Sequence, residues 1–382
     1  MKAPKAVRQV AGLLLIAFLV QGCGSPPAKK AGGHPAQPKH KVKAKAKVGS
    51  TTAAFTGSLP PLDAVQFLSQ QVGFVAGQGI VLETTDGGKT WLRVYDGQAQ
   101  ITALDIVDQS QGYAVTATGQ LLSWSQGSWQ AVSGLPGAVA AVAPQGQAPQ
   151  ELLTTQGALY RQSGSGWQLN SVKDVVAMAF PGQGTGYAVS ESSGAAPQVF
   201  ASADGGATWQ KSFSPAVSPP RNWSTALEAS GGSAWLLLTS NSGQSEHQPY
   251  VAYSTGDSGQ HWQEALAGPL FASQGMYPQA PSSLYGLQAG PIAVTGQTAY
   301  FVSWRPDSPQ NVTALTSTSD GGQTFSQQPL LQVAHDATPG FFSPLGIFAL
   351  PGGTVWLAGS RGGVGKLIES QDGGQSWQVP AF

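Results

Sequence analysis

The chain has 382 residues, with 50 glycines, 27 prolines and 11 tryptophans, and only 10% of its residues are charged. This composition is typical of an all-β protein with many turns. The formal net charge is zero, but all 19 acidic residues follow position 50, whereas ten of the 19 basic residues precede it. The body of the chain is therefore acidic, which argues against nucleic-acid binding because contacts with phosphate need a positive surface.

The amino terminus predicts a secretion signal followed by a lipid anchor. Lys2, Lys5 and Arg8 precede an apolar run, 13–20, that is too short to span a bilayer. The run ends in L-V-Q-G-C, which resembles a bacterial lipoprotein signal (1–22) in which Cys23 is lipidated and becomes the first mature residue. The alternative is an ordinary secretory signal with a chance cysteine. Either signal implies an extracytoplasmic body, and the lipid would anchor it to the cell membrane, or to the outer membrane if the organism has one. Cys23 is the only cysteine, so no intramolecular disulfide supports that body.

The segment 23–58 predicts a disordered tether. It is rich in Lys, Pro, Gly and Ala, and few of its residues are able to form a core. Its lysines either lie on anionic lipid headgroups or keep a soluble spacer extended, and the sequence does not separate these alternatives.

An eight-residue pattern recurs along the rest of the chain. Its form is Ser/Thr-x-Asp-x-Gly-x-Thr/Ser-Trp/Phe, and one copy has His261 in place of the second hydroxyl residue. The copies are T-T-D-G-G-K-T-W (84–91), S-A-D-G-G-A-T-W (202–209), T-G-D-S-G-Q-H-W (255–262), T-S-D-G-G-Q-T-F (318–325) and S-Q-D-G-G-Q-S-W (370–377). The aspartate accepts backbone N–H bonds, glycine supplies the positive φ of the turn, and the aromatic residue starts the next strand and buries apolar surface. Each copy therefore predicts a hairpin that satisfies its own polar groups.

The spacing of the closing aromatic residues predicts seven units. The interval from Trp91 to Trp209 is about twice the others, and within it L-L-S-W-S-Q-G-S-W (121–129) and L-Y-R-Q-S-G-S-G-W (159–167) end in Trp129 and Trp167 without the aspartate. Units of roughly 40 to 60 residues are typical of four-stranded propeller blades. Apolar runs such as G-F-V-A (73–76) and G-Y-A-V (112–115) recur where a second strand, buried on both faces, is expected. We therefore predict an all-β, seven-bladed β-propeller over 59–382, although a split into two domains is also possible.

The segment G-F-V-A-G-Q-G-I-V-L-E-T-T-D-G-G-K-T-W (73–91) resembles the Asp-box (BNR) repeats of the photosystem II stability and assembly factor family, and the similarity extends over roughly 60–382. Sialidases, large glucanases and the sortilin luminal domain carry similar boxes. The resemblance implies that the boxes lie at the blade periphery, on the face away from the ligand, and that their residues are structural. These residues are Asp86, Gly88, Trp91, Asp204, Gly206, Trp209, Asp257, Gly259, Trp262, Asp320, Gly322, Phe325, Asp372, Gly374 and Trp377.

The sequence contains no recognisable catalytic constellation. The five arginines of the body are scattered, whereas a sialidase needs an arginine cluster. The isolated acids Asp105, Asp108, Glu151, Glu191 and Asp307 do not form a pair by spacing, and isolated acids on loops are usually solvated. The histidines His247, His261 and His335 lack metal-ligand spacing, and the boxes lack the dense acidic run of a calcium loop. We therefore expect no catalytic residues, no cofactor and no metal.

Long insertions predict where a partner would bind. Five of them fall between or within the last four units, on the face that the turn geometry places opposite the boxes. The candidate partner-binding rim consists of Arg221, Trp223, Tyr250, Tyr277, Trp304 and Arg305, residue types that anchor protein interfaces. The alternative is that these side chains only fold the long loops back on themselves.

Three functional interpretations remain open from the sequence. The first is a membrane-tethered, non-catalytic monomeric scaffold that binds a protein partner and assists assembly of a membrane complex, as the family resemblance implies. The second is a propeller that binds or cleaves glycans, as in the sialidase and glucanase branches. The third is a purely structural envelope protein. The absence of an arginine cluster and of a paired-acid motif favours the first over a hydrolase.

Overall fold

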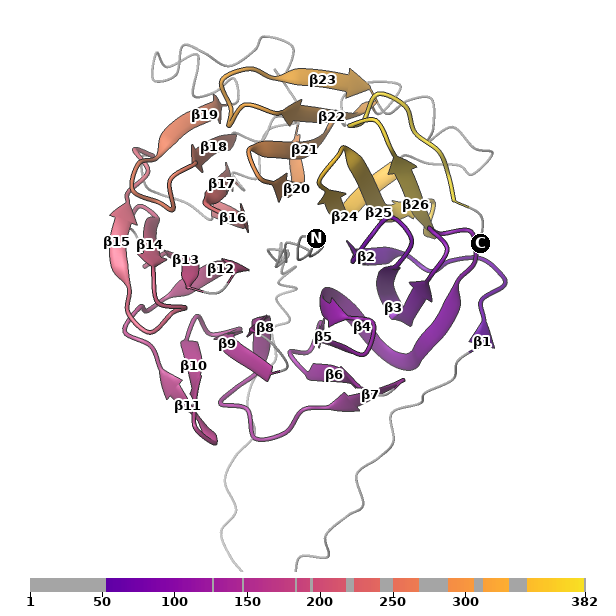
Figure 1. The fold of residues 1–382 in the computed structure, drawn as a ribbon, viewed down its shortest axis with the longest axis horizontal. Helices are drawn as coiled ribbons and strands as arrows, with labels where there is room; N and C mark the ends of the chain where they lie inside the picture. Colours follow the sequence, from indigo (N-terminus) through magenta and orange to yellow (C-terminus); the bar gives the residue numbers. More distant parts are fainter. Residues whose placement is uncertain are drawn as a thin grey trace, which may run out of the picture.

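The computed structural model describes residues 53–125, 127–145, 148–182, 184–192, 195–217, 223–240, 250–267, 288–305, 312–329 and 342–380. Within these ranges every regular element is a β-strand, and the strands form antiparallel sheets arranged around one axis (Figure 1). The sheets are numbered below as blades in chain order.

Blades 1 and 2 share the long strand β4. Blade 1 consists of β2 (Leu62–Phe67), β3 (Gly73–Thr84) and the first part of β4 (Leu92–Asp108), and β1 (Ala53–Ala54) pairs with the start of β4. The first half of β3 pairs with β2 and its second half with β4. Gln71 precedes β3 and Gly87 follows it, and the Gly87 N–H donates to the Gln71 carbonyl at 2.8 Å. The two ends of β3 therefore lie close together, so β3 folds back on itself as a hairpin and supplies two strands of the blade. Blade 2 contains the rest of β4, β5 (Gln111–Thr116), β6 (Leu121–Ser125) and β7 (Ser128–Ala131).

Blades 3 to 6 are separate four-stranded sheets, and blade 7 has three strands and a short fourth pairing. Blade 3 is β8 (Val139–Gln145), β9 (Ala148–Thr154), β10 (Leu159–Ser163) and β11 (Gly166–Leu169). Blade 4 is β12 (Val175–Gly182), β13 (Thr185–Ser190), β14 (Gln198–Ser202) and β15 (Gln210–Phe213). Blade 5 is β16 (Trp223–Ser230), β17 (Ser233–Ser240), β18 (Tyr250–Thr255) and β19 (Gln263–Ala267). Blade 6 is β20 (Gln288–Thr295), β21 (Thr298–Arg305), β22 (Val312–Thr318) and β23 (Ser326–Pro329). Blade 7 is β24 (Phe342–Leu350), β25 (Thr354–Arg361) and β26 (Val364–Ser370), with Gln378 bridged to Glu369.

The hydrophobic core of the described chain is divided into seven clusters, and each lies between two neighbouring blades. The second strands are buried on both faces because each is covered by a blade on either side. The seventh cluster joins blade 7 to blade 1, where the rings of Phe67 and Trp356 stack at 3.8 Å between centroids with 6° between their planes. The predicted seven-bladed propeller is therefore confirmed.

The ring closes by packing of blade 7 against blade 1, with no sheet shared between them in the described chain. Residues before β2 fill the junction: the Gly365 N–H donates to the Leu59 carbonyl at 2.8 Å, and Phe55 and Leu59 are buried in the same cluster as Trp356. A side chain at Gly365 would meet the Pro60 carbonyl at 2.0 Å, so glycine is required for this close approach.

Candidate functional site

The five Asp-boxes form closely similar hydrogen-bond networks in the turns between the third and fourth strands. In the first box, Asp86 Oδ1 accepts from the Thr84 hydroxyl and the Thr90 N–H, both at 2.9 Å, and Oδ2 accepts from the Thr90 hydroxyl at 2.6 Å. In the fifth box, Asp372 accepts the equivalent three bonds from Ser370 and Ser376. The hydrogen bonds from the residue four positions later, led by its hydroxyl, lower the pKa of Asp86 and Asp372 to about 2. These carboxylates remain charged and hydrogen-bonded within their own turns, as a structural role requires.

The boxes lie on the same face as the turns between the first and second strands. In each box the N–H of the residue after the aspartate donates to a carbonyl of that turn, for example Gly205 to Gly184 at 3.0 Å and Gly373 to Gly353 at 2.8 Å. The equivalent bonds join Gly87 to Gln71, Ser258 to Gly232 and Gly321 to Gln297. The predicted division of the turns between two faces is consistent with these bonds, and we call this side the box face.

The second glycine of each box also sits against the preceding blade. Gly206 has φ +87°, and a Cβ atom there would meet Glu151 Oε1 of blade 3 at 2.6 Å. At Gly322 the corresponding contacts are Trp235 and Ala265 of blade 5, and at Gly374 the contact is Leu315 of blade 6. Each box is therefore an interblade contact as well as a turn, and both uses require glycine.

The face opposite the boxes carries a repeated irregularity in the innermost strands. These strands pack side by side around the axis. Six of the seven contain a register shift close to their first paired residues, at the strand end that lies on the face opposite the boxes. A bulge of this kind redirects one side chain out of the regular alternation. The bulge residues are Asp63, Thr102, Ala140, Val176, the pair Gly290 and Pro291, and Leu345, and we call this set the axial ring.

The axial ring exposes apolar side chains on strands that are otherwise buried. Val176 is 42% exposed and Leu345 is 48% exposed, although Val175 and Ala177 on either side of Val176 are only 2% and 4% exposed. Asp63 is the one charged member, and burial raises its pKa while a hydrogen bond from Gln100 at 3.1 Å opposes the rise. Val176 belongs to blade 4 and Leu345 to blade 7, so the exposed apolar side chains come from opposite sides of the ring.

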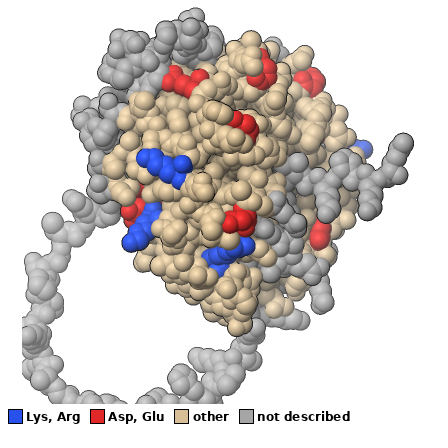
Figure 2. Space-filling model, turned by 60° about the vertical axis from the view of Figure 1, so that its left-hand side comes forward, with Lys and Arg blue, Asp and Glu red and all other residues tan. Residues whose placement is uncertain are grey.

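Figure 2 shows a face of the molecule on which charged side chains are few and scattered. In the described ranges no three His, Cys, Asp or Glu side chains are grouped so as to hold a metal ion. Within the same ranges, no helix has the length and apolarity needed to cross a membrane.

The predicted partner-binding rim is largely beyond what the structure describes. Arg221 and Tyr277 lie outside the described residues, and Trp223, Trp304 and Arg305 belong to β16 and β21 but their side chains lie outside them too. Tyr250 is described, and it is only 4% exposed within the core between blades 5 and 6, where burial raises its pKa. Tyr250 is thus placed as a core residue, and the rim hypothesis depends on the other five.

The isolated acids do not behave as the sequence suggested. Solvation was expected, but Glu151 is fully buried and Asp105 is 3% exposed. Glu151 Oε1 lies 3.3 Å from Arg161 Nε, and the Thr225 hydroxyl of blade 5 donates to Glu191 of blade 4. Asp108 accepts from Ser110 in its own turn, and Asp307 lies outside the described residues, as do His247 and His335.

Sequence reasoning missed the axial ring. Two of its members carried a usable signal, because proline and glycine within a strand mark a bulge and both occur in A-G-P-I (289–292) and S-P-L-G-I (343–347). The segment V-V-A-M (175–178) carried none, because all four residues are apolar and the alternation is hidden.

The geometry defines an Asp-box β-propeller. The family model described as photosynthesis system II assembly factor YCF48 matches residues 58–193, so the resemblance drawn from the sequence is confirmed. Among solved structures, one described as YCF48 bound to D1 peptide is 19% identical, with 84% of this chain and 96% of that chain covered and a TM-score of 0.54. A GH74 xyloglucanase from Xanthomonas campestris is 15% identical over 88% of this chain and 56% of that chain, with a TM-score of 0.53. The WD40 propeller domain of Doa1 is 12% identical over 85% and 97%, with a TM-score of 0.50. At these identities the structural likeness concerns the fold alone, and no curated protein matches the sequence.

Proposed function

We propose that this chain is a non-catalytic, membrane-tethered propeller that binds a protein partner through the face opposite the boxes and assists assembly of a membrane complex. The observation that carries the proposal is the exposure of Val176 and Leu345 on innermost strands, at the centre of that face. The match to the assembly-factor family, and a solved relative described as bound to a peptide, support a protein partner.

The charge of the body distinguishes the partner from a nucleic acid or an acidic chain. Acidic residues outnumber basic residues after position 50 by 19 to nine, and Asp63 is the charged member of the axial ring. A partner segment with an aliphatic side chain and a nearby positive charge fits this chemistry.

Partner capture from solubilised membranes tests the binding face. We expect a single stoichiometric partner to be retained by the wild type and lost from a Val176→Asp, Leu345→Asp double variant. The matched control is Leu169→Asp with Val379→Asp, because these residues are 58% and 51% exposed but lie outside the axial ring. Arg305→Ala and Trp223→Ala test the rim in the same assay, with weaker capture and nearly unchanged stability expected. Equal capture by the wild type and all variants would show that the partner does not bind this face.

The tether is tested separately at Cys23. We propose that Cys23 carries lipid and holds the propeller on the outside of the cell membrane, or on the outer membrane if one is present, because the residues before it match a lipoprotein signal. Metabolic labelling with an alkyne fatty acid is expected to mark the wild type and not Cys23→Ser, and the variant is expected to leave the membrane fraction. An unlabelled wild type that stays membrane-bound would contradict the lipid anchor.

A further inference from the structure

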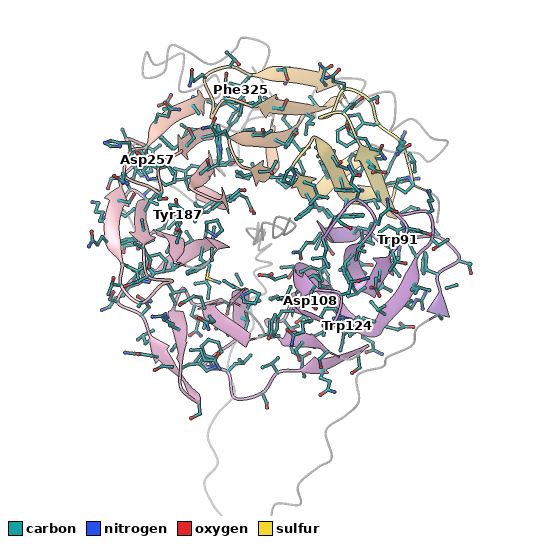
Figure 3. All side chains as sticks on the ribbon, viewed as in Figure 1. Trp91, Asp108, Trp124, Tyr187, Asp257 and Phe325 are labelled. Carbon is teal, nitrogen blue, oxygen red and sulfur yellow. The ribbon has the colours of Figure 1, made fainter. Side chains whose placement is uncertain are left out.

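A polar furrow crosses the box face over blades 5, 6 and 7. Its first section, of about 320 Å³, lies between the boxes of blades 5 and 6 and is lined by residues including His261, Trp262, Gln263, Gln297 and Gln323. It shares Ser233 and Gln297 with a second section of about 510 Å³, which in turn shares Thr298 and Tyr300 with a third of about 400 Å³. Asp257 and Phe325, labelled in Figure 3, mark the adjacent boxes on either side of the first section.

Departures from the repeated box pattern converge on this furrow. His261 replaces a hydroxyl residue, and its Nδ1 keeps the contact with Asp257 Oδ2 at 2.6 Å. The His261 side chain is 88% exposed, so Nε2 remains for a ligand, which a threonine at this position would not offer. The turn is therefore satisfied as in the other boxes, and the extra nitrogen adds nothing to the fold.

The neighbouring box of blade 6 departs from the pattern in a second way. The indole N–H donates to the carbonyl of the second box glycine at 3.1 Å for Trp91, 3.0 Å for Trp209 and 3.1 Å for Trp377. Phe325 has no such donor, and Gly322, between the lining residues Gly321 and Gln323, is partly exposed whereas the equivalent glycines of the other boxes are buried. The Gly322 carbonyl therefore lacks the indole partner that the carbonyls of Gly88, Gly206 and Gly374 have.

The furrow lining selects for an uncharged, hydroxyl-rich ligand. All three sections are lined by Ser, Thr, Gln and Gly with aromatic residues, and their lining residues include no lysine or arginine. Asp257, Asp320 and Asp372 also line the furrow. All three are already occupied by hydrogen bonds within their boxes, and those bonds hold their pKa values low, so their negative charges disfavour anions. Amide side chains donate and accept at once, which matches neighbouring sugar hydroxyls, and the partly exposed Trp262 offers an apolar edge to the ring of a sugar.

We propose that this furrow binds a neutral oligosaccharide, with the section between blades 5 and 6 as its principal subsite. The volume of that section, about 320 Å³, falls at the lower end of the range of ligand pockets, which begins at about 300 Å³. The furrow is lined mainly by turn residues, and the outermost strands β19 and β23 contribute only Gln263, Ser326 and Gln328 to it, which leaves little strand edge for an extended peptide to pair with. The site is separate from the protein-binding face, so the propeller can contact a glycan and a protein partner at once.

Isothermal titration of the full chain tests the site. The probes are cellotetraose, chitotetraose and maltotetraose, with sialyllactose as the charged comparison. We expect at least one neutral probe to bind, and binding to weaken about fivefold or more in a His261→Thr, Gln323→Ala double variant, as the loss of one or two hydrogen bonds predicts. His261→Thr restores the usual box residue, so the variant is expected to melt at the wild-type temperature.

Matched substitutions in the first box serve as controls. Thr90 and Lys89 occupy in blade 1 the positions of His261 and Gln323, so Thr90→His and Lys89→Ala introduce comparable changes away from the furrow. These controls are expected to bind the probe as the wild type does. Absence of binding by every neutral probe, preference for sialyllactose, or equal weakening by the control pair would overturn the proposal. Partner capture by the furrow variant is expected to be unchanged, so the glycan site and the protein-binding face are tested independently of each other.

Discussion

The buried carboxyl group of Glu151 makes the stability of the propeller depend on pH. Glu151 lies in the middle of β9, the second strand of blade 3, where it pairs with Ala143 of the innermost strand. The corresponding position of the other blades holds an aromatic side chain that pairs with the innermost strand in the same way: Phe74, Tyr113, Tyr187, Trp235, Tyr300 and Trp356. A carboxyl group thus occupies a site that the fold otherwise fills with a ring.

The surroundings of Glu151 favour its protonated form. Neither carboxyl oxygen accepts a hydrogen bond within the described chain, and the box of blade 4 covers the group at Gly206. Burial is the main cause that raises the pKa of Glu151 to about 8; the ion pair with Arg161 opposes the rise and the negative charge of Asp204 adds to it.

The direction of the pH effect follows from the two pKa values. Unfolding returns the group to its ordinary value of 4.5, so between pH 4.5 and about 8 the folded state holds a proton that the unfolded state has lost. The stabilising contribution is therefore complete below pH 4.5, falls by up to about 1.4 kcal/mol per pH unit through this window, and is absent above it. The whole window sets an upper bound of about 5 kcal/mol.

Chemical denaturation of the wild type and of Glu151→Gln from pH 4 to 9 measures this effect. The difference between the two curves removes the contributions of other groups, and we expect the wild type to lose stability relative to the variant as the pH rises from about 5 to 8. Arg161→Met provides a second arm, because removing the opposing charge is expected to extend the loss to higher pH. Parallel curves for the wild type and Glu151→Gln would show that the carboxyl group titrates normally and refute the reasoning.

Three further predictions concern the box and the ring closure. Gly206→Ala is expected to lower the free energy of unfolding by about 2–5 kcal/mol in urea denaturation, because it combines a left-handed backbone with a clash against Glu151. The control Gly164→Ala, at φ +59° with open space around it, is expected to cost about 1–2 kcal/mol. Equal losses would show that the interblade contact is unimportant. Trp209→Ala is expected to cost about 3 kcal/mol by the same measurement, near the lower limit for aromatic residues, because Trp209 is only partly buried. A negligible loss would show that the closing aromatic residues do not contribute to the core. Trp356→Ala is expected to cost about 5 kcal/mol because it is fully buried against Phe67 at the ring closure, and a smaller loss than for Trp209→Ala would contradict the packing at that junction.

The sequence was sufficient to predict the ring because the box is a local structure. Its aspartate, hydroxyl and glycine residues bond to one another within eight residues, so the pattern that identifies the turn also specifies its geometry. Trp129 and Trp167 located two blades without an intact box, and both lie in fourth strands, β7 and β11. Counting closing aromatics therefore gave the number of blades.

The interiors of the interblade contacts were not predictable in the same way. Second strands are apolar on both faces, so their sequence does not show which neighbour each side chain meets, and a single carboxyl group such as Glu151 looks like an ordinary surface acid. The axial bulges depend on the register between two strands, and only the copies with proline or glycine carry a local sign of it.

The division of the core into seven interblade clusters explains where variation is tolerated. Each cluster involves only two blades, so a substitution in one leaves the packing of the others unchanged, as in other repeat architectures. Blade 3 has lost its box aspartate and carries Glu151, and blades 5 and 6 have acquired His261 and Phe325, yet in all three the third strand still pairs with the fourth. The buried Glu151 acts on stability alone, whereas the exposed His261 and the box of Phe325 lie where we propose that a glycan binds. The repeated hydrogen bonds of the box therefore keep the hairpin folded, and the side chains that differ between the boxes are free to vary.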